Sequence, residues 1–253
     1  MDYQLKNKLA LVTGSTKGIG KATIQQLHAE GARVIIHGRS QAEAQQLADS
    51  LKDRAYAVAA DLSSLSGVDQ LIAQVKKIGQ PDILVNNAGI FEPKAFLDIP
   101  DEDWLRFFEV NVMSGVRLSR AFLPGMLKQN WGRIIFISSE SAINIPTEMI
   151  HYGMTKTAQL AVSRGLAELT KSTAVTVNAV LPGPTMSDGV KMKKTKEEMN
   201  EFFFKEGRPT SLIQRFADPQ EVAHLITYVA SPLSSATNGA ALRVDGGVVK
   251  SII

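Results

Sequence analysis

The sequence predicts one α/β domain, residues 1–253, built on a doubly wound sheet of about seven mostly parallel strands with helices on both faces. Three observations predict it. Short apolar runs alternate with longer amphipathic segments along most of the chain. The apolar character of the runs suggests strands that are covered on both faces. A glycine-rich turn joins the first run to the first amphipathic segment.

Each strand is predicted by a run of apolar, often β-branched residues. The first is Lys8–Thr13, which contains four consecutive apolar residues from Leu9 to Val12. Six more follow, at Arg33–His37, Ala55–Ala60, Asp82–Asn86, Gly132–Ser138, Thr173–Val180 and Ala241–Val244. Because helix-length segments separate most of them, the strands are expected to run parallel.

The segments between the strands carry apolar residues at helical spacing. The first helix, Ile19–Glu30, follows the glycine turn directly. The others are predicted at Gln41–Lys52, Ser64–Ile78, Glu102–Gln129, His151–Lys171 and Pro219–Ala230. Glu102–Gln129 is predicted as a single long helix.

The glycine turn reads Thr13-Gly14-Ser15-Thr16-Lys17-Gly18-Ile19-Gly20 and predicts a dinucleotide site. Gly14 permits the tight turn, Gly18 lets the backbone approach a pyrophosphate, and Gly20 lets the helix and strand pack closely. The N–H groups at the start of the helix are available to the anion. The spacing G-x-x-x-G-x-G departs from the general G-x-G-x-x-G fingerprint, and an ordinary glycine-rich turn is the alternative.

Polar motifs come directly after several of the predicted strands. They are the glycine turn, Asn86–Gly89, Ser139 and Pro182-Gly183. Ligands of doubly wound sheets bind at the carboxyl ends of the strands, near the point where the strand order reverses. We therefore expect these motifs to converge on one edge of the sheet.

Tyr152 and Lys156 stand four residues apart in a predicted helix, and Ser139 lies thirteen residues before the tyrosine. Residues at this spacing share a helix face, so the ammonium group lies beside the phenol. At roughly 4 Å and an effective dielectric constant of about 20, the charge contributes about 4 kcal/mol. That would bring the pKa of the phenol from about 10 to near neutrality. The pair is predicted to exchange a proton with a substrate.

These motifs, in this order, resemble those of the short-chain dehydrogenase/reductase family, from about Lys8 to Val248. The matching residues are Thr13–Gly20 for T-G-x-x-x-G-I-G, Asn86–Gly89 for N-N-A-G, Asn111 for the mid-helix asparagine, Ser139 for the serine of I-S-S, Tyr152 and Lys156 for Y-x-x-x-K, Pro182-Gly183 for P-G, and Val244–Gly247 for V-D-G-G. The resemblance implies a Rossmann fold and NAD(P)-dependent oxidoreduction of carbonyl or CH–OH groups.

The resemblance implies a catalytic role for four residues. Tyr152 would act as general acid in carbonyl reduction and as general base in alcohol oxidation. Lys156 would lower the pKa of Tyr152 and hydrogen-bond the nicotinamide ribose. Ser139 would hold the substrate oxygen, and Asn111 would position a water that links Lys156 to solvent. The alternative is that these residues have no catalytic role. Tyr152 would then be a half-buried helix tyrosine and Lys156 a solvated lysine, while Ser139 would be a strand-end hydroxyl and Asn111 a cap at a helix kink.

The residues after the second strand, His37-Gly38-Arg39-Ser40, predict NADP(H) as the favoured cofactor, with NAD(H) as the alternative. A carboxylate that would grip the ribose 2′-hydroxyl is absent there, whereas Arg39 and Lys17 can bind a 2′-phosphate. The competing interpretations are that Arg39 and Lys17 are surface charges without a ligand and that Asp61 caps a helix. The residues expected to contact the dinucleotide are Gly14, Ser15, Thr16, Lys17, Gly18, Ile19, Gly20, Arg39, Asp61, Leu62, Asn87, Ala88, Gly89, Tyr152, Lys156, Pro182, Gly183, Thr185 and Ser187.

The resemblance also implies a substrate lid at about residues 184–216, whose apolar residues predict a partly hydrophobic substrate. Ser139, Glu140, His151 and Tyr152 are expected to contact the substrate, although Glu140 and His151 could equally face solvent. Asn130 stands where acyl-carrier-protein ketone reductases of the family tend to carry an arginine. That difference argues against a role in fatty-acid synthesis without excluding it.

Composition excludes several other classes of function. With 253 residues, 44% of them hydrophobic, the chain leaves no room for a separate substrate domain. There is no cysteine, and the four histidines lack metal-ligand spacing, so no metal is expected. The N-terminus has no apolar signal core and no run of about 18 apolar residues exists, which predicts a cytoplasmic protein without a membrane partner. A net charge of +3 gives no reason to expect nucleic acid.

The helices at 102–129 and 151–171 carry more apolar residues than one sheet face normally covers. In the family these helices form an interface, so a homodimer or homotetramer is expected; full burial within a monomer is the alternative. The partner is expected to be a small carbonyl or alcohol. The competing functions are an NAD-dependent alcohol dehydrogenase of the same fold, a non-catalytic NADP(H)-binding sensor, and a purely structural protein.

Overall fold

The protein is described by a computed structural model that covers residues 2–186 and 203–252. Its centre is a seven-stranded sheet in which every pair of neighbouring strands is parallel. The strands are β1 (Leu9–Val12), β2 (Arg33–Gly38), β3 (Ala55–Ala59), β4 (Ile83–Asn86), β5 (Gly132–Ile137), β6 (Val175–Pro182) and β7 (Ala241–Val244). All seven predicted strands are thus confirmed.

The strand order is β3-β2-β1-β4-β5-β6-β7, so the winding reverses between β1 and β4. The glycine turn leaves β1 and the segment Asn86–Gly89 leaves β4, so the two motifs meet at this reversal. Several predicted boundaries differ by one or two residues, most of all in β6, which runs from Val175 to Pro182 instead of from Thr173 to Val180. Pro182 pairs with Val244 at the very end of the strand, where the missing N–H costs the ladder little.

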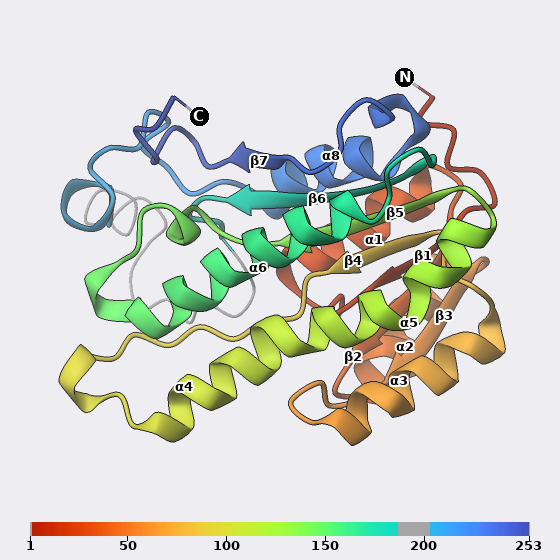
Figure 1. Cartoon of the computed structure of the whole chain (residues 1–253), viewed down its shortest axis with the longest axis horizontal. Coiled ribbons are helices and arrows are strands. Elements are labelled where there is room, and N and C mark those ends of the chain that lie inside the picture. Colours follow the sequence, from red (N-terminus) through yellow and green to blue (C-terminus); the bar gives the residue numbers. More distant parts are fainter. Residues whose placement is uncertain (1, 187–202, 253) are drawn as a thin grey trace.

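The helices lie between the strands along the chain (Figure 1). They are α1 (Gly18–Ala29), α2 (Gln41–Leu51), α3 (Leu65–Ile78), α4 (Asp101–Phe108), α5 (Ser114–Lys128), α6 (Ile150–Glu168) and α8 (Pro219–Ala230). Side-chain caps set two of the starts: Ser40 accepts from Glu43 N–H, and Ser64 accepts from Gly67 N–H. Ser64 therefore caps α3, and Asp61 does not.

The predicted long helix at 102–129 is interrupted by a π-helical turn, η2 (Glu109–Met113), between α4 and α5. At the end of this turn the N–H of Ser114 reaches back five residues to the carbonyl of Glu109, instead of the four of an α-helix. Figure 1 shows the two helices running on as one long ribbon beside α6. The difference matters because Asn111 lies in the turn.

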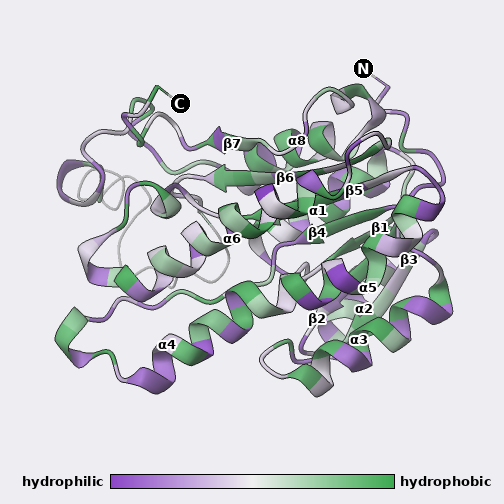
Figure 2. Ribbon diagram, viewed as in Figure 1, coloured by the Kyte–Doolittle hydropathy of each residue, from purple (hydrophilic) through white to green (hydrophobic). Residues whose placement is uncertain are grey.

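Alternate residues of the strands face two separate apolar cores. In β1, Leu9 and Leu11 pack with α3, α5 and α6, whereas Ala10 and Val12 pack with α1, α2 and α8. Figure 2 shows the apolar strands enclosed by helices whose outer residues are more polar. Each fully buried Leu, Ile or Val contributes on the order of 1.5–3 kcal/mol, so these layers hold the strand ends in register. None of the helices in residues 2–186 and 203–252 is long and apolar enough to cross a membrane.

Candidate active site

The turns after β1 and β4 are tied together by Thr13 and Asn87. The Thr13 hydroxyl accepts hydrogen bonds from the N–H groups of Asn87 (3.0 Å) and Ala88 (2.9 Å). The Asn87 amide in turn donates to the carbonyl oxygens of Thr13 (2.8 Å) and Gly14 (3.1 Å). These reciprocal bonds hold the glycine turn against the neighbouring strand end.

The shape of the glycine turn depends on Gly14 and Gly20. Gly14 has a φ of +61°, which favours glycine. A Cβ at Gly20 would lie 2.4 Å from the carbonyl oxygen of Gly14 and 2.6 Å from the Asn87 amide nitrogen. Lys17, the N-cap of α1, makes no side-chain cap, so the first N–H groups of the helix are left for an anion. The turn therefore fits a dinucleotide pyrophosphate.

His37 lies beneath the turn and orders its backbone. Its Nδ1 accepts from Gly14 N–H (3.0 Å), and its Nε2 is 3.2 Å from the carbonyl oxygen of Ala60. Because Gly14 can only donate, Nδ1 carries no proton and Nε2 is the donor. Burial lowers the pKa of His37 to about 4, which keeps the ring neutral in this arrangement. The Ser15 N–H also donates to the His37 carbonyl at 2.8 Å.

The charged residues expected at the ribose phosphate lie beyond the ends of β1, β2 and β3. Arg39 is exposed, and Lys17 forms an ion pair with Glu43 at 3.0 Å. Hydrogen bonds from Ser63 lower the pKa of Asp61, and the positive charge of Arg39 adds to this effect. Leu62 is buried in the core, so its side chain does not face a ligand.

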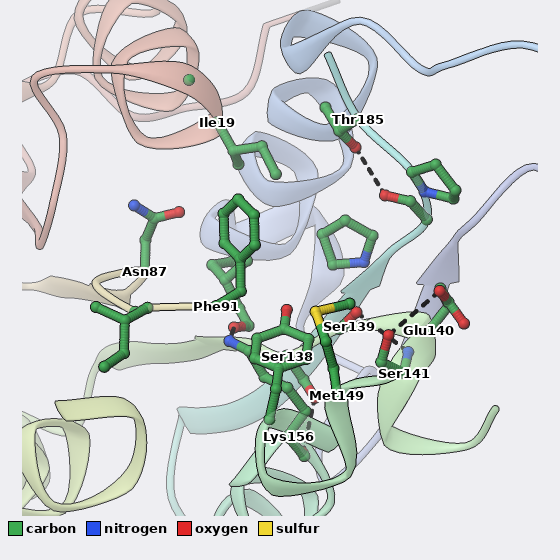
Figure 3. A pocket seen from close by; sticks show the side chains of 18 of the residues that line it. Ile19, Asn87, Phe91, Ser138, Ser139, Glu140, Ser141, Met149, Lys156 and Thr185 are labelled. Atoms are coloured by element: carbon green, nitrogen blue, oxygen red, sulfur yellow. Dashed lines mark hydrogen bonds between the residues drawn. The ribbon is translucent and has the colours of Figure 1, made fainter. Parts of the chain in front are cut away.

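A cavity of about 540 Å³ opens at the carboxyl ends of β1, β4, β5 and β6 (Figure 3). The predicted site residues that line it are Lys17, Gly18, Ile19, Gly20, Asn87, Gly89, Ser139, Glu140, Tyr152, Lys156, Pro182, Gly183 and Thr185. Residues from the glycine turn, β5, α6 and the end of β6 thus share one cavity. Gly14, Ser15, Thr16, Arg39, Asp61, Leu62, Ala88, Asn111 and His151 lie outside its lining.

Tyr152 faces this cavity close to Ser139, and the ring of Phe91 meets its ring edge-on at 6.4 Å. Burial raises the pKa of Tyr152 to about 12, the nearby charge of Glu140 adds to the rise, and a hydrogen bond with Ser139 opposes it. The prediction that Lys156 brings this pKa near neutrality is therefore wrong for this structure. Desolvation of the phenolate is the largest cause of the rise, and Lys156 is not among the groups that shift this pKa.

Lys156 is buried, and its Nζ lies 5.5 Å from the centre of the Tyr152 ring. Nζ donates to the carbonyl oxygen of Ile137 (2.9 Å) and to Oε1 of Gln159 (3.3 Å). Figure 3 shows Lys156 among the side chains that line the cavity. Burial lowers the pKa of Lys156 to about 7, so at neutral pH it carries only part of its charge.

Asn111 has all its polar atoms engaged. Its Oδ1 accepts from Ile90 N–H (2.8 Å), and its Nδ2 donates to Ile90 O and to the Thr155 hydroxyl, both at 3.0 Å. Its backbone carbonyl accepts from the Gln159 amide at 2.6 Å. The Asn111 side chain thus anchors the segment after β4, while its backbone carbonyl is bound by the Gln159 amide.

Glu140 and Arg208 form a buried ion pair at the far wall of the cavity. Oε1 of Glu140 accepts from Nε of Arg208 (2.9 Å) and from the Ser141 hydroxyl (3.2 Å). Burial raises the pKa of Glu140, while Arg208 opposes the rise. The expectation that Glu140 lies at the cavity holds, but its carboxylate is bound to Arg208.

The expectation that His151 contacts the substrate is not supported. Its ring packs against Phe107, with centroids 4.1 Å apart, and against Trp104 at 6.0 Å, so it faces α4. The physical reason is helix geometry, because adjacent residues point about 100° apart and Tyr152 occupies the cavity side.

The expected lid is described only at its two ends. Pro184 and Thr185 line the cavity from one side, and Phe203, Arg208 and Phe216 from the other. Thr185 donates to the carbonyl of Gly183 at 2.9 Å. Ser187 and the rest of the segment 187–202 lie outside the described residues.

Sequence reasoning missed Arg208 and Gln159. Gln159 stands at positions i+7 from Tyr152 and i+3 from Lys156, so helical spacing alone would have drawn attention to it. Arg208 has no comparable signal, because it lies 68 residues from its partner Glu140. Only the folded chain brings those two side chains together.

Comparisons with known proteins bear on this site. A family model described as enoyl-(acyl carrier protein) reductase matches residues 14–249. The chain is 50% identical over 266 residues to the uncharacterized oxidoreductase YvaG of Bacillus subtilis (strain 168), with 100% of both chains covered. It is 34% identical over 253 residues to the 3-oxoacyl-(acyl-carrier-protein) reductase FabG of Aquifex aeolicus (strain VF5), covering 98% of this chain and 100% of the relative.

A solved structure with the same fold contains both a dinucleotide and a substrate. It is the L-sorbose reductase from Gluconobacter frateurii complexed with NADPH and L-sorbose. The TM-score is 0.90 at 30% sequence identity, and 100% of both chains is covered.

Proposed function

The chain belongs to the short-chain dehydrogenase/reductase family, enzymes that act on CH–OH or C=O groups with NAD(P), and we propose that it transfers a hydride between NADP(H) and a carbonyl or secondary alcohol. One observation carries the proposal. Ser139, Tyr152 and Lys156 line the same cavity as the glycine turn that fits a pyrophosphate. A nicotinamide that extends from the turn would reach these three residues.

In this proposal Tyr152 is the general acid of carbonyl reduction. The bound dinucleotide supplies the hydride that reduces the carbonyl carbon. Tyr152 donates its phenolic proton to the carbonyl oxygen, and Ser139 donates a hydrogen bond to the same oxygen and orients it. Lys156 stabilises the resulting phenolate when it is charged. A pKa of about 12 keeps Tyr152 protonated at neutral pH, the form that reduction requires.

NADP(H) is favoured over NAD(H) by the charges near the expected ribose. Arg39 and Lys17 offer positive groups beyond the ends of β2 and β1. The segment His37-Gly38-Arg39-Ser40, where an NAD-binding protein would carry an acidic residue, contains none. Lys17 is paired with Glu43, but both side chains are about half exposed, and such pairs contribute only about 0–1 kcal/mol. The L-sorbose reductase relative was solved with NADPH. NAD(H) is the alternative.

The substrate is proposed to be a small, partly apolar carbonyl compound or alcohol. Ile90, Phe91, Met149 and Phe216 give the cavity apolar walls, and the Glu140–Arg208 pair supplies a polar end. Asn130 is occupied elsewhere, because its Oδ1 accepts from the N–H of Ala174. The proposal therefore does not extend to acyl-carrier substrates.

The arrangement of the chain is also a proposal. Residues 1–253 would form one catalytic unit with a lid at about 184–216, and the active form would be a homodimer or homotetramer. Exposed apolar side chains on and before α4 support an oligomer: Leu97, Leu105 and Phe108 are 92%, 70% and 37% exposed.

Tyr152→Phe tests the catalytic proposal, because it removes only the phenolic oxygen. NADPH oxidation is followed by absorbance with a panel of ketones and ketoses that includes L-sorbose. The wild type is expected to be active and the variant slower by at least about a hundredfold, the scale of losing a positioned acid.

NADPH titration into both proteins is the control, since the variant should bind the dinucleotide like the wild type. Equal turnover by the two proteins would remove Tyr152 from its role. Tight NADPH binding by a wild type that turns over none of the compounds would support the non-catalytic sensor. If the wild type does not bind NADPH, both the enzyme hypothesis and the sensor hypothesis are wrong.

A further inference from the structure

The side chain of Gln159 bridges Lys156 and the π-turn between α4 and α5. Gln159 is 1% exposed and lies one turn after Lys156 on α6. Its Oε1 accepts from Nζ of Lys156 at 3.3 Å, and its Nε2 donates to the carbonyl oxygen of Asn111 at 2.6 Å. The orientation of the amide follows from these partners, because a carbonyl only accepts and an ammonium only donates.

The Asn111 carbonyl lies in the π-turn between α4 and α5, where it accepts a hydrogen bond from the Gln159 amide. A π-turn interrupts the regular hydrogen-bond ladder of an α-helix. The Asn111 side chain is used separately, since it holds both backbone polar atoms of Ile90. The Gln159 amide therefore supplies a side-chain donor to the backbone of this buried turn.

Nζ of Lys156 is held by two acceptors on different elements, Ile137 at the end of β5 and Gln159 on α6. A lysine side chain with four rotatable bonds needs such fixed partners to keep one position. The ring of Tyr152, on the same helix, has its centre 5.5 Å from Nζ, and Glu140, after β5, lines the same cavity. The π-turn contributes the uncharged Asn111, and the turn after β4 contributes Gly89, where a Cβ would lie 3.6 Å from Nζ.

We propose that Gln159 is a positioning residue for Lys156, fixing its Nζ beside Tyr152 by a direct link to the π-turn carbonyl of Asn111. The inference rests on the proposed function, in which Lys156 stabilises the Tyr152 phenolate. An amide accepts and donates through different atoms and does not pass a proton along as water does. Gln159 therefore holds the ammonium without carrying protons to it.

Two substitutions of Gln159 are predicted to shift the titration of Lys156 in opposite directions. Gln159→Met keeps the length of the side chain and removes both hydrogen bonds. It withdraws an acceptor from the ammonium form, so Lys156 should lose its proton at a pH lower by about one unit. Gln159→Glu replaces the amide by a carboxylate, which favours the ammonium form and should move the titration up by about one unit.

The experiment follows Lys156 by NMR of protein with ¹³C at the lysine ε-carbons, assigned by comparison with Lys156→Arg. Ser163→Ala is the matched control. Ser163 is four residues further along the same buried side of α6, and among the residues that the structure describes its hydroxyl has no hydrogen-bond partner. Its titration should equal that of the wild type. Thermal unfolding of each variant reports any general damage to the fold separately.

A purely structural role for Gln159 would change the unfolding temperature of the variants without moving the titration in opposite directions. Unchanged titration in both Gln159 variants overturns the inference, as does a shift of the same sign in both. Because this measurement needs no substrate, it stands apart from the proposed function. If the wild type is an active reductase, kcat of Gln159→Met should also fall about tenfold, with KM for the carbonyl substrate unchanged.

Discussion

At the scale of single residues, burial has opposite effects on the two central groups of the site. It raises the pKa of Tyr152 to about 12 and lowers that of Lys156 to about 7. Both shifts have the same cause, since a low-dielectric surrounding disfavours the charged form of each group. In the proposed reduction the neutral phenol donates a proton, and the charge that would stabilise its phenolate is present only when Lys156 is protonated.

These values predict the pH dependence of carbonyl reduction. A lysine with a lowered pKa holds its proton below about pH 7 and loses it above. We expect kcat for reduction to fall on the order of tenfold between about pH 6 and about pH 8, because the phenolate loses a neighbouring charge. The measurement is the steady-state rate with saturating NADPH across this range.

Carbonyl reduction by Lys156→Met should be slow, and its pH profile should show no inflection between about pH 6 and about pH 8. Lys171→Met, which removes an exposed lysine beyond the end of α6, should keep the profile of the wild type. An inflection that persists in Lys156→Met would assign it to another group.

At the scale of elements, α2 brings a negative charge to the edge of the expected cofactor site. Glu43 lies in the first turn of α2, where an acidic residue is favoured by the helix dipole, and it pairs with Lys17 of the glycine turn. The same carboxylate would repel a ribose 2′-phosphate held by Lys17 and Arg39. If NADP(H) is the cofactor, as proposed, the placement that helps the helix would therefore weaken binding of its 2′-phosphate.

Glu43→Gln should therefore tighten NADPH binding by about threefold to tenfold, with little effect on NADH. The dissociation constants of both dinucleotides are measured by fluorescence titration at low and high salt, and the gain should shrink at high salt. Asp49→Asn changes the same charge near the other end of α2 and serves as the control. Equal gains for NADPH and NADH would place the 2′-phosphate away from Lys17.

At the scale of the whole molecule, α4 and the segment before it carry exposed apolar side chains. Leu105 is 70% exposed and Leu97 is 92% exposed. The long ribbon of α4 and α5 forms one outer side of the molecule (Figure 1). Burial of such side chains against a second copy would remove them from water, which is the main driving force of stable homo-oligomers.

The double variant Leu105→Glu, Phe108→Glu is predicted to lower the oligomeric state, because two carboxylates would have to lose their hydration at the interface. Size-exclusion chromatography with light scattering measures the mass. Leu65→Glu, at the exposed start of α3, is the control and should leave the mass of the wild type unchanged. A wild type that is already monomeric at micromolar concentration would contradict the proposed oligomer.

Much of the fold was predictable because its signals are local. Apolar runs in β1 to β7, serine caps before α2 and α3, and the glycines between β1 and α1 each act within a few residues. The order of the site motifs followed from the parallel sheet, since each motif leaves a strand at the same edge. Tyr152, Lys156 and Ser139 could thus be assigned to one cavity before their positions were known.

The sequence by itself determined the parallel sheet, the glycine turn and the residue types at the strand ends, because short-range preferences and the period of apolar residues specify them. Only the tertiary structure decided the charge states of Tyr152 and Lys156 and the pairing of Glu140 with Arg208. It also decided that His151 packs against α4 instead of facing the cavity, and that a π-turn forms at Asn111. These depend on burial and on contacts between distant segments. A helical spacing of four residues places two side chains next to each other, but the degree of burial of each group decides whether it is charged.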